Sequence, residues 1–254
     1  MFRMVELIEL TAGYDGKEIV KNVSAIFKNF EISVLVGPNG SGKSTLTESI
    51  IGLNRKHSGK ILIDGADSDT LSLRERALKV AYMAQFHPVS NISVERLVLH
   101  GRFPHLSYPR KYGREDYAVV DSALKAVRGE ELREKNVQYL SGGERQRAYI
   151  AMALAQETPN IFMDEPTNFL DVCYQAELKK LARKLADGGK AVCVVMHDLC
   201  AALEIADKLL VLDGGELRSC ASAEETFSSG VLEEVFHVRI GKVETENGTR
   251  YYYD

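Results

Sequence analysis

The sequence has 254 residues, 45% of them hydrophobic, and a formal net charge of −4. This length and apolar content suffice for one large domain, or for one domain with an inserted lobe, and they exclude a disordered chain. The acidic balance argues against a general nucleic-acid-binding protein, because contacts with phosphate backbones need clustered Lys and Arg. Basic residues gather only in short patches, such as Arg74/Arg76/Lys79 and Arg110/Lys111/Arg114.

Targeting and redox features are also sparse. Residues 1–10 lack the apolar core of a signal peptide, and the sequence contains no run of about 18 apolar residues, the length of a transmembrane helix. We therefore expect a cytosolic chain that does not itself cross a bilayer. The cysteines have no CxxC spacing and no paired His, which argues against a zinc site or a disulfide framework. We expect all four to be buried thiols in a reducing compartment: Cys173, Cys193, Cys200 and Cys220.

The first elements of the chain predict an antiparallel start. Residues 5–10 alternate as a strand should, a Gly-Tyr-Asp-Gly turn occupies 13–16, and a second strand pattern covers 18–27. Tyr14 lies in that turn. An exposed ring there could offer a flat face to a nucleotide base, although a turn tyrosine packed on its own sheet is the commoner arrangement.

Residues 32–53 organise the rest of the chain: an apolar strand pattern, a glycine-rich turn and a helical pattern ending near Leu53. The turn matches the P-loop pattern at every fixed position: Gly37, Pro38, Asn39, Gly40, Ser41, Gly42, Lys43, Ser44 and Thr45. Its glycines let consecutive NH groups converge on an anion, and the helix adds the positive end of its dipole. Lys43 would reach terminal phosphates and Ser44 would help to hold Mg²⁺. A glycine-rich turn with a chance lysine is the alternative.

The middle of the chain changes character twice. A short strand at 58–65, a helix at 73–78 and an apolar strand at 80–84 lead to Gln85. From Phe86 to about Gln138, prolines at 88, 104 and 109 and helical patterns at 94–100 and 115–127 predict an inserted helical lobe. Ser141 and Glu144 then form a capping-box pattern that starts a helix running to about Gln156. Its first turn, beside two glycines, is either a second anion site or an ordinary cap.

Two later strands end in polar side chains. The strand at 160–164 delivers Asp164 and Glu165 to its carboxyl end, where ligands bind in open parallel sheets. Because adjacent strand residues point to opposite sides, one acid could serve a metal and the other an attacking water; two solvated acids are the alternative. The strand at 190–196 places His197 at a similar edge, although a lone histidine is usually structural. A helix at 175–185, a hairpin over 208–219 and a terminal hairpin around Asn247-Gly248 complete the chain, and the last has no evident function.

With these motifs in order, the chain resembles the nucleotide-binding subunits of ABC transporters over nearly its whole length. The stretch Leu140–Arg147 is similar to the ABC signature. The resemblance implies an α/β fold with a P-loop NTPase core of mixed and parallel strands, an N-terminal antiparallel β subdomain and an inserted α-helical subdomain. Residues 1–254 would form one nucleotide-binding domain, with 1–85 and 158–254 as the core and 86–157 as the helical subdomain that carries the signature.

The resemblance also implies a site for ATP and Mg²⁺ between two copies paired head to tail, with Ser141 and Gly143 of one copy closing over the phosphate loop of the other. Its catalytic residues would be Glu165 as the base, His197 as the γ-phosphate switch, Gln85 as the sensor of metal and water, and Lys43. Nucleotide contacts would come from Tyr14 on the adenine, the loop from Gly37 to Thr45, Ser141, Gly142, Gly143 and the D-loop residue Asp171, and the metal would take Ser44, Gln85 and Asp164. The unusual D-loop residue Phe169 leaves the contacts between the two copies open.

A narrower resemblance lies in the lobe. Gly101-Arg102-Phe103-Pro104-His105 is similar to a segment of ATPases from importers of ferric siderophores, haem, cobalamin and, in some members, molybdate. It implies a permease contacted through Phe86 to Arg110, a separate substrate-binding protein, and a peripheral position on the cytoplasmic side of the membrane. Charge reversal at Arg102 would then uncouple uptake without removing the ATPase. The alternative for this segment is a turn with solvated Arg and His. The alternatives for the function of the chain are a soluble ABC ATPase of iron–sulfur cluster assembly or DNA maintenance, and a nucleotide-gated module without turnover.

Overall fold

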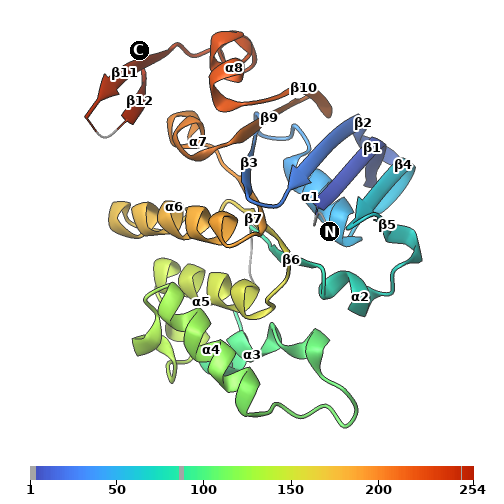
Figure 1. Cartoon of the computed structure of the whole chain (residues 1–254), viewed down its shortest axis with the longest axis vertical. Coiled ribbons are helices and arrows are strands. Elements are labelled where there is room, and N and C mark those ends of the chain that lie inside the picture. The colour runs from blue at the N-terminus through green and yellow to red at the C-terminus, as the bar shows by residue number, and fades with distance from the viewer. Residues whose placement is uncertain (1–3, 86–88, 247) are drawn as a thin grey trace.

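A six-stranded sheet runs through the centre of the molecule (Figure 1). The structure, a computed structural model, describes residues 4–85, 89–246 and 248–254. The strand order is β10-β9-β3-β8-β7-β6, with β9, β3, β8, β7 and β6 parallel and β10 antiparallel to β9. The strands are β3 (Glu31–Val36), β6 (Val80–Met83), β7 (Asn160–Asp164), β8 (Ala191–Val195), β9 (Lys208–Asp213) and β10 (Glu216–Ala221).

A four-stranded antiparallel sheet covers one side of the central sheet. It has the order β2-β1-β4-β5, with β1 (Met4–Tyr14), β2 (Lys17–Lys28), β4 (Arg55–Ile63) and β5 (Ala66–Asp67). Phe27 of β2 meets Phe162 of β7 edge to face, with ring centroids 5.1 Å apart, an arrangement that aromatic pairs prefer. Helix α1 (Lys43–Ile51) lies on this side and buries Leu46 and Ile50 in the same core.

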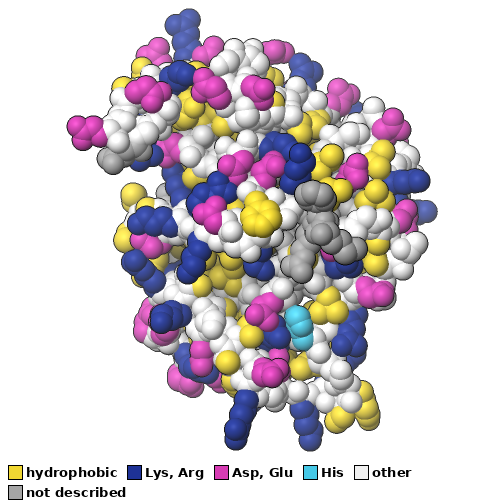
Figure 2. All heavy atoms as spheres, viewed as in Figure 1, with side chains coloured by type: hydrophobic (Ala, Val, Ile, Leu, Met, Phe, Trp, Pro, Cys, Tyr) yellow, Lys and Arg dark blue, Asp and Glu magenta, His cyan; other side chains and the backbone are white. Residues whose placement is uncertain are grey.

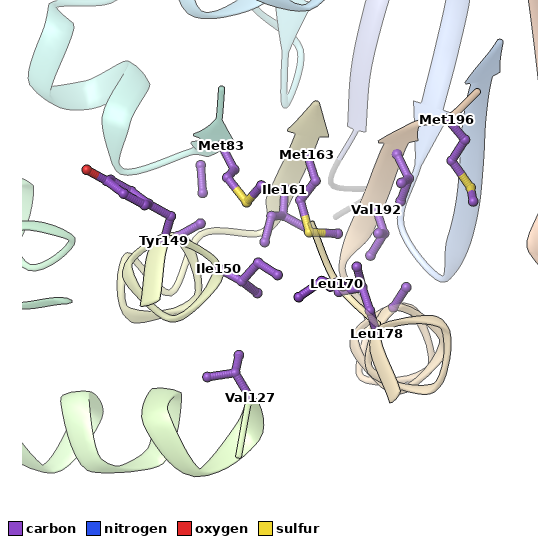
Figure 3. Close-up of a cluster of buried hydrophobic side chains, with 14 of the residues drawn as sticks. Met83, Val127, Tyr149, Ile150, Ile161, Met163, Leu170, Leu178, Val192 and Met196 are labelled. Carbon is purple, nitrogen blue, oxygen red and sulfur yellow. The ribbon is translucent and has the colours of Figure 1, made fainter. Parts of the chain in front are cut away.

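The other side of the central sheet is covered by helices α5 (Gly142–Ala155) and α6 (Val172–Asp187). Figure 3 shows Met83, Ile161 and Met163 of the sheet facing Ile150 of α5, with Leu178 of α6 nearby. The strands are apolar on both faces: Met163 faces these helices and Phe162 faces the antiparallel sheet. Burial on both faces explains why β7 and β8 read as continuous apolar runs.

The remaining helices form two groups at opposite ends of the molecule (Figure 1). At one end, α3 (Val94–His100) and α4 (Arg114–Ala126) pack with α5, and short 3-10 turns connect them. At the other end lie α7 (Leu199–Ile205), α8 (Ala223–Ser228), α9 (Val231–Phe236) and a hairpin of β11 (Ile240–Thr245) and β12 (Gly248–Tyr253). The short α2 (Leu73–Ala77) leads into β6.

The predicted fold class and the predicted order of elements are confirmed. Among the differences, α6 extends to both sides of the predicted 175–185: Asp171 caps its start through the Tyr174 amide (3.0 Å), and the helix ends at Asp187, directly before Gly188. The expectation of four buried thiols is wrong: Cys193 is buried, Cys200 is half-buried, and Cys173 and Cys220 are exposed. No helix within the described ranges is long and apolar enough to cross a membrane.

Candidate functional site

The phosphate-loop pattern forms a tight turn between β3 and α1. A Cβ atom at position 37 would lie 2.2 Å from the Leu212 carbonyl oxygen, so this position accepts glycine alone. Gly42 has φ = 103° and directly precedes α1, and in the described part of the chain no side chain caps this helix. The first-turn NH groups of α1 therefore face the loop, which is the arrangement that binds phosphate groups. The Ser41 hydroxyl oxygen in the same turn is buried and has no hydrogen-bond partner among the residues that the structure describes.

Lys43 folds back over this loop. Its ammonium group donates to the carbonyl oxygens of Gly37 (2.8 Å) and Pro38 (3.1 Å). Burial lowers the pKa of Lys43, while the charges of Glu165 and Asp164 oppose that change. A buried cation held by neutral carbonyls beside two carboxylates is well placed to bind an anion that enters the loop.

A surface pocket brings the predicted residues of several elements together. It is lined by Tyr14, Ile19, Asn39, Gly40, Gly42, Lys43, Ser44, Thr45, Gln85 and Glu165. Tyr14 stands at its rim with 43% of its surface exposed, and its hydroxyl donates to Glu48 Oε2. The Tyr14 ring is therefore fixed by α1 and is not packed away against its own sheet. Within the described residues, Ser141, Gly142, Gly143 and Asp171 do not line this pocket.

Asp164 ends β7 and is 1% exposed. Burial raises the pKa of its carboxyl group, and a hydrogen bond from the Ser44 hydroxyl opposes this effect. Tyr82 contacts one carboxylate oxygen, Oδ2, at 3.4 Å. The other, Oδ1, is buried and has no hydrogen-bond partner in the described part of the chain. A buried carboxylate oxygen without a partner beside a serine hydroxyl fits a hard divalent cation, which prefers oxygen ligands.

Glu165 is also buried but contacts a different set of residues. Its Oε2 atom accepts hydrogen bonds from Gln85 Nε2 and Asn168 Nδ2, both at 2.6 Å, and its Oε1 atom contacts His197 Nε2. Strand β7 has ended at Asp164, and Glu165 has φ = 51°. The two acids thus differ in surroundings because the backbone turns after the strand, and not through the strand alternation that the sequence suggested. Asn168, which with Phe169 forms an uncommon D-loop pair in the sequence, was not predicted to contact Glu165, although its place three residues after Glu165 in a turn was a signal.

Ser141 forms the predicted capping box. Its hydroxyl accepts from the Glu144 amide at 3.3 Å, and the Glu144 carboxylate accepts from the Ser141 amide at 2.9 Å. Hydrogen bonds from Lys135 and Ser141 lower the pKa of Glu144 to about 2. A Cβ atom at Gly142 would lie 3.0 Å from the Phe169 side chain, so the loop after β7 runs close beside the start of α5, where Ser141 and Gly142 remain exposed. The Phe169 ring remains 73% exposed.

Comparison with known families identifies the family of this chain. The sequence profile of the ABC transporter family matches residues 20–168, more than half of the chain. The chain belongs to the ABC transporter family. Its relatives include YclP, the petrobactin import ATP-binding protein of Bacillus subtilis (strain 168), which is 34% identical over 93% of this chain and 94% of YclP. FepC, the ferric enterobactin transport ATP-binding protein of Escherichia coli (strain K12), is 33% identical over 91% of this chain and 86% of FepC.

Solved ABC transporter structures agree with the fold. A metal-chelate type ABC transporter in an inward-facing conformation matches all of this chain and 97% of its own chain, with a TM-score of 0.84 and 26% identity. The dimeric bacterial ABC cassette MJ0796 matches 86% of this chain and 98% of its own, with a TM-score of 0.76 and 28% identity. This ABC transporter chain is therefore an ATP-binding subunit with ATP hydrolase activity.

The importer-like segment of this ABC subunit has a structural role that the sequence did not reveal. Arg102 is 7% exposed, and its guanidinium contacts Asp116 (3.0 Å), Glu157 (2.8 Å) and the Ala155 carbonyl oxygen (2.8 Å). His105 Nε2 lies 2.9 Å from the Gln156 carbonyl oxygen. The segment ties the end of α3 to the end of α5. The alternative of a solvated arginine in this turn is wrong, because the Arg102 side chain is buried and paired, and the same burial argues against a direct contact of Arg102 with a permease.

Proposed function

We propose that this chain splits ATP to power the uptake of an iron(III)-siderophore, haem or cobalamin-type metal chelate through a membrane permease. One observation carries the enzymatic part: the buried Glu165 carboxylate, held by Gln85, Asn168 and His197, borders the same pocket as the phosphate loop. The names of YclP, a petrobactin import protein, and FepC, a ferric enterobactin transport protein, support this cargo class. Molybdate import by a related system is the second candidate for the cargo.

In the proposed mechanism, water attacks the γ-phosphate in line with the leaving ADP. Glu165 takes the proton of that water, and the water replaces one of the three donors that now contact the carboxylate. Lys43 leaves the loop carbonyl groups and neutralises charge that develops on the phosphate oxygens. His197 and Gln85 keep Glu165 oriented towards the pocket, and Tyr14 stacks on the adenine.

Ser44 and Asp164 would hold Mg²⁺ together with phosphate oxygens of ATP, with the Gln85 amide oxygen as a further contact. The ion would supply charge neutralisation on the phosphates. Asp164 Oδ1, which lacks a hydrogen-bond partner within the described ranges, and the neighbouring Ser44 hydroxyl support this assignment.

We expect Ser44→Ala to raise the Mg²⁺ concentration needed for half-maximal ATPase activity by about tenfold, because a hydroxyl ligand is lost and Asp164 remains. Titration of Mg²⁺ at saturating ATP measures this value. Ser49→Ala is the control. It removes a hydroxyl from the same helix, and this hydroxyl hydrogen-bonds to the Thr45 carbonyl oxygen and to Asn54 Oδ1. An unchanged Mg²⁺ requirement in Ser44→Ala would remove Ser44 from the metal site.

Two copies would complete the site head to tail, with Ser141, Gly142, Gly143 and Asp171 of one copy facing the ATP of the other. These residues lie outside the pocket of their own chain, and the MJ0796 cassette was solved as a dimer. The α5 start next to two glycines suits a phosphate group. Residues 1–85 and 158–254 would act as the ATP-binding core, and 86–157 as the subdomain that carries the signature.

The permease would dock in a groove between α2 and the segment after α3. Its lining includes Leu73, Arg74, Phe103, Tyr108 and Arg110. Leu73, Phe103 and Tyr108 are 79%, 48% and 96% exposed, a cluster of apolar side chains typical of an interaction surface. The chain would then lie peripherally on the cytoplasmic side of the membrane. Phe86, where the predicted contact region begins, lies outside the described residues.

Reconstitution tests the whole proposal. The chain should co-purify with a multi-span permease, and vesicles that contain the complex should accumulate a ferric siderophore offered with a capture protein only when ATP is present on the side of this chain. Recovery of an active ATPase without a membrane partner would favour the soluble assembly or remodelling role. Binding of ATP without phosphate release at millimolar ATP would favour a nucleotide-gated module.

A further inference from the structure

The C-terminal hairpin, β11 and β12, is fastened to the helices that follow β8 and β10. Tyr251 packs edge to face on Phe227 of α8, with ring centroids 5.2 Å apart. Arg250 pairs with Glu204 of α7 at 3.2 Å, and Lys242 pairs with Glu224 at 2.8 Å. Ion pairs that are half exposed contribute little each, so the packing of Tyr251 on Phe227 is the main contact that holds the hairpin against α8.

Tyr253, on the same face of β12 as Tyr251, reaches the start of α7. Its hydroxyl accepts a hydrogen bond from the Leu199 amide at 2.9 Å and donates to Asp198 Oδ1 at 3.3 Å. The same carboxylate oxygen caps α7 through the Ala201 amide at 3.1 Å. Burial raises the pKa of Tyr253, so the hydroxyl keeps its proton and can serve as donor and acceptor at neutral pH.

Asp198 and Leu199 directly follow His197, which contacts Glu165. On the other side of His197, the Met196 amide donates to the Leu35 carbonyl oxygen at 3.1 Å. The histidine thus sits on a short bridge between β8 and α7. One end of the bridge is fixed by the central sheet, and the other end is fixed by α7 and by the hydroxyl of Tyr253.

We propose that Tyr253 is a positioning residue of the ATPase site, which the C-terminal hairpin provides to hold the His197–Leu199 bridge. The proposal rests on the proposed role of His197 and Glu165 in ATP hydrolysis. It assigns a function to β12. The Tyr253 hydroxyl on this strand acts on the ATPase site, although the phosphate loop of that site lies near the other end of the sequence. Loss of the hydroxyl leaves the Leu199 amide without this acceptor and lets the bridge shift.

Tyr253→Phe removes the hydroxyl and keeps the ring. We expect kcat for ATP to fall about three- to tenfold, the loss that follows from one or two hydrogen bonds of ordinary strength, while KM for ATP stays within about twofold. Tyr252→Phe is the matched control: the adjacent ring is equally exposed, at 50% against 51%, and lies on the other face of β12. It should keep the kcat of the wild-type protein.

A spectroscopic measurement separates positioning from a general loss of structure. The sequence has six histidines, and the imidazole proton resonance of His197 can be assigned by its loss in His197→Gln. This resonance should move in Tyr253→Phe and stay in place in Tyr252→Phe, with the other histidine resonances unchanged in both. Wild-type kcat in Tyr253→Phe, or a His197 resonance that does not move, would overturn the proposal. Absence of ATPase activity in the wild-type protein would instead refute the proposed function, and the resonance would still test the contact.

Discussion

Replacing Glu165 by Gln is expected to lower kcat for ATP hydrolysis by about 10²- to 10⁴-fold while ATP still binds. The amide cannot take the proton of the attacking water, whereas the substitution leaves the phosphate loop and Lys43, which line the same pocket, unchanged. Because ATP is not consumed, the two-copy assembly should persist. Phosphate release, equilibrium binding of a fluorescent ATP analogue and size-exclusion chromatography with ATP measure the three effects.

Glu134→Gln provides the control for this experiment. The Glu134 side chain is 85% exposed on the helical lobe, and its substitution should leave turnover unchanged. If Glu165→Gln kept half or more of the wild-type turnover, another group would have to act as the base. Loss of ATP binding together with turnover would point to damage of the phosphate loop instead.

Charge reversal at Arg102 is expected to destabilise the fold rather than to uncouple transport. The guanidinium is buried against Asp116 and Glu157, so Arg102→Glu brings a third carboxylate next to these two and removes the cation that neutralises them. We expect the free energy of unfolding to fall by about 3–5 kcal/mol. Urea unfolding followed by circular dichroism measures this change.

Arg110→Glu tests the docking surface in the same region without this damage. Arg110 is exposed, and its guanidinium lies 4.6 Å from the centroid of the Phe103 ring in the groove. The free energy of unfolding should change by less than about 1 kcal/mol, and uptake should fall while the basal ATPase remains. An Arg102→Glu protein as stable as the wild type, with uptake lost, would restore the surface role of Arg102.

Local chemistry explains which features could be predicted from the sequence. The phosphate loop, the capping box at Ser141 and the buried strands each depend on neighbours within a few residues, so the pattern and the structure agree. The surroundings of Arg102 depend on Asp116, 14 residues away, and on Glu157, 55 residues away. The burial of Arg102 is therefore a tertiary effect, which the residues next to Arg102 in the sequence did not indicate.

The contacts of the acidic pair were beyond sequence reasoning for a similar reason. Glu165 takes a positive φ after β7 has ended, and Asn168 and His197 come to it from a turn and from the end of another strand. The link from Tyr253 to Leu199 spans 54 residues.

On the face shown in Figure 2, acidic and basic side chains are interspersed, in agreement with the short basic patches of the sequence.

The most direct measurement is the structure of Glu165→Gln with ATP and Mg²⁺. The account predicts two copies related by a twofold axis, each ATP lying between the Gly37–Thr45 loop of one copy and Ser141 and Gly143 of the partner subunit. An ATP-bound single copy, or a pairing that leaves the start of α5 away from the phosphates, would contradict it.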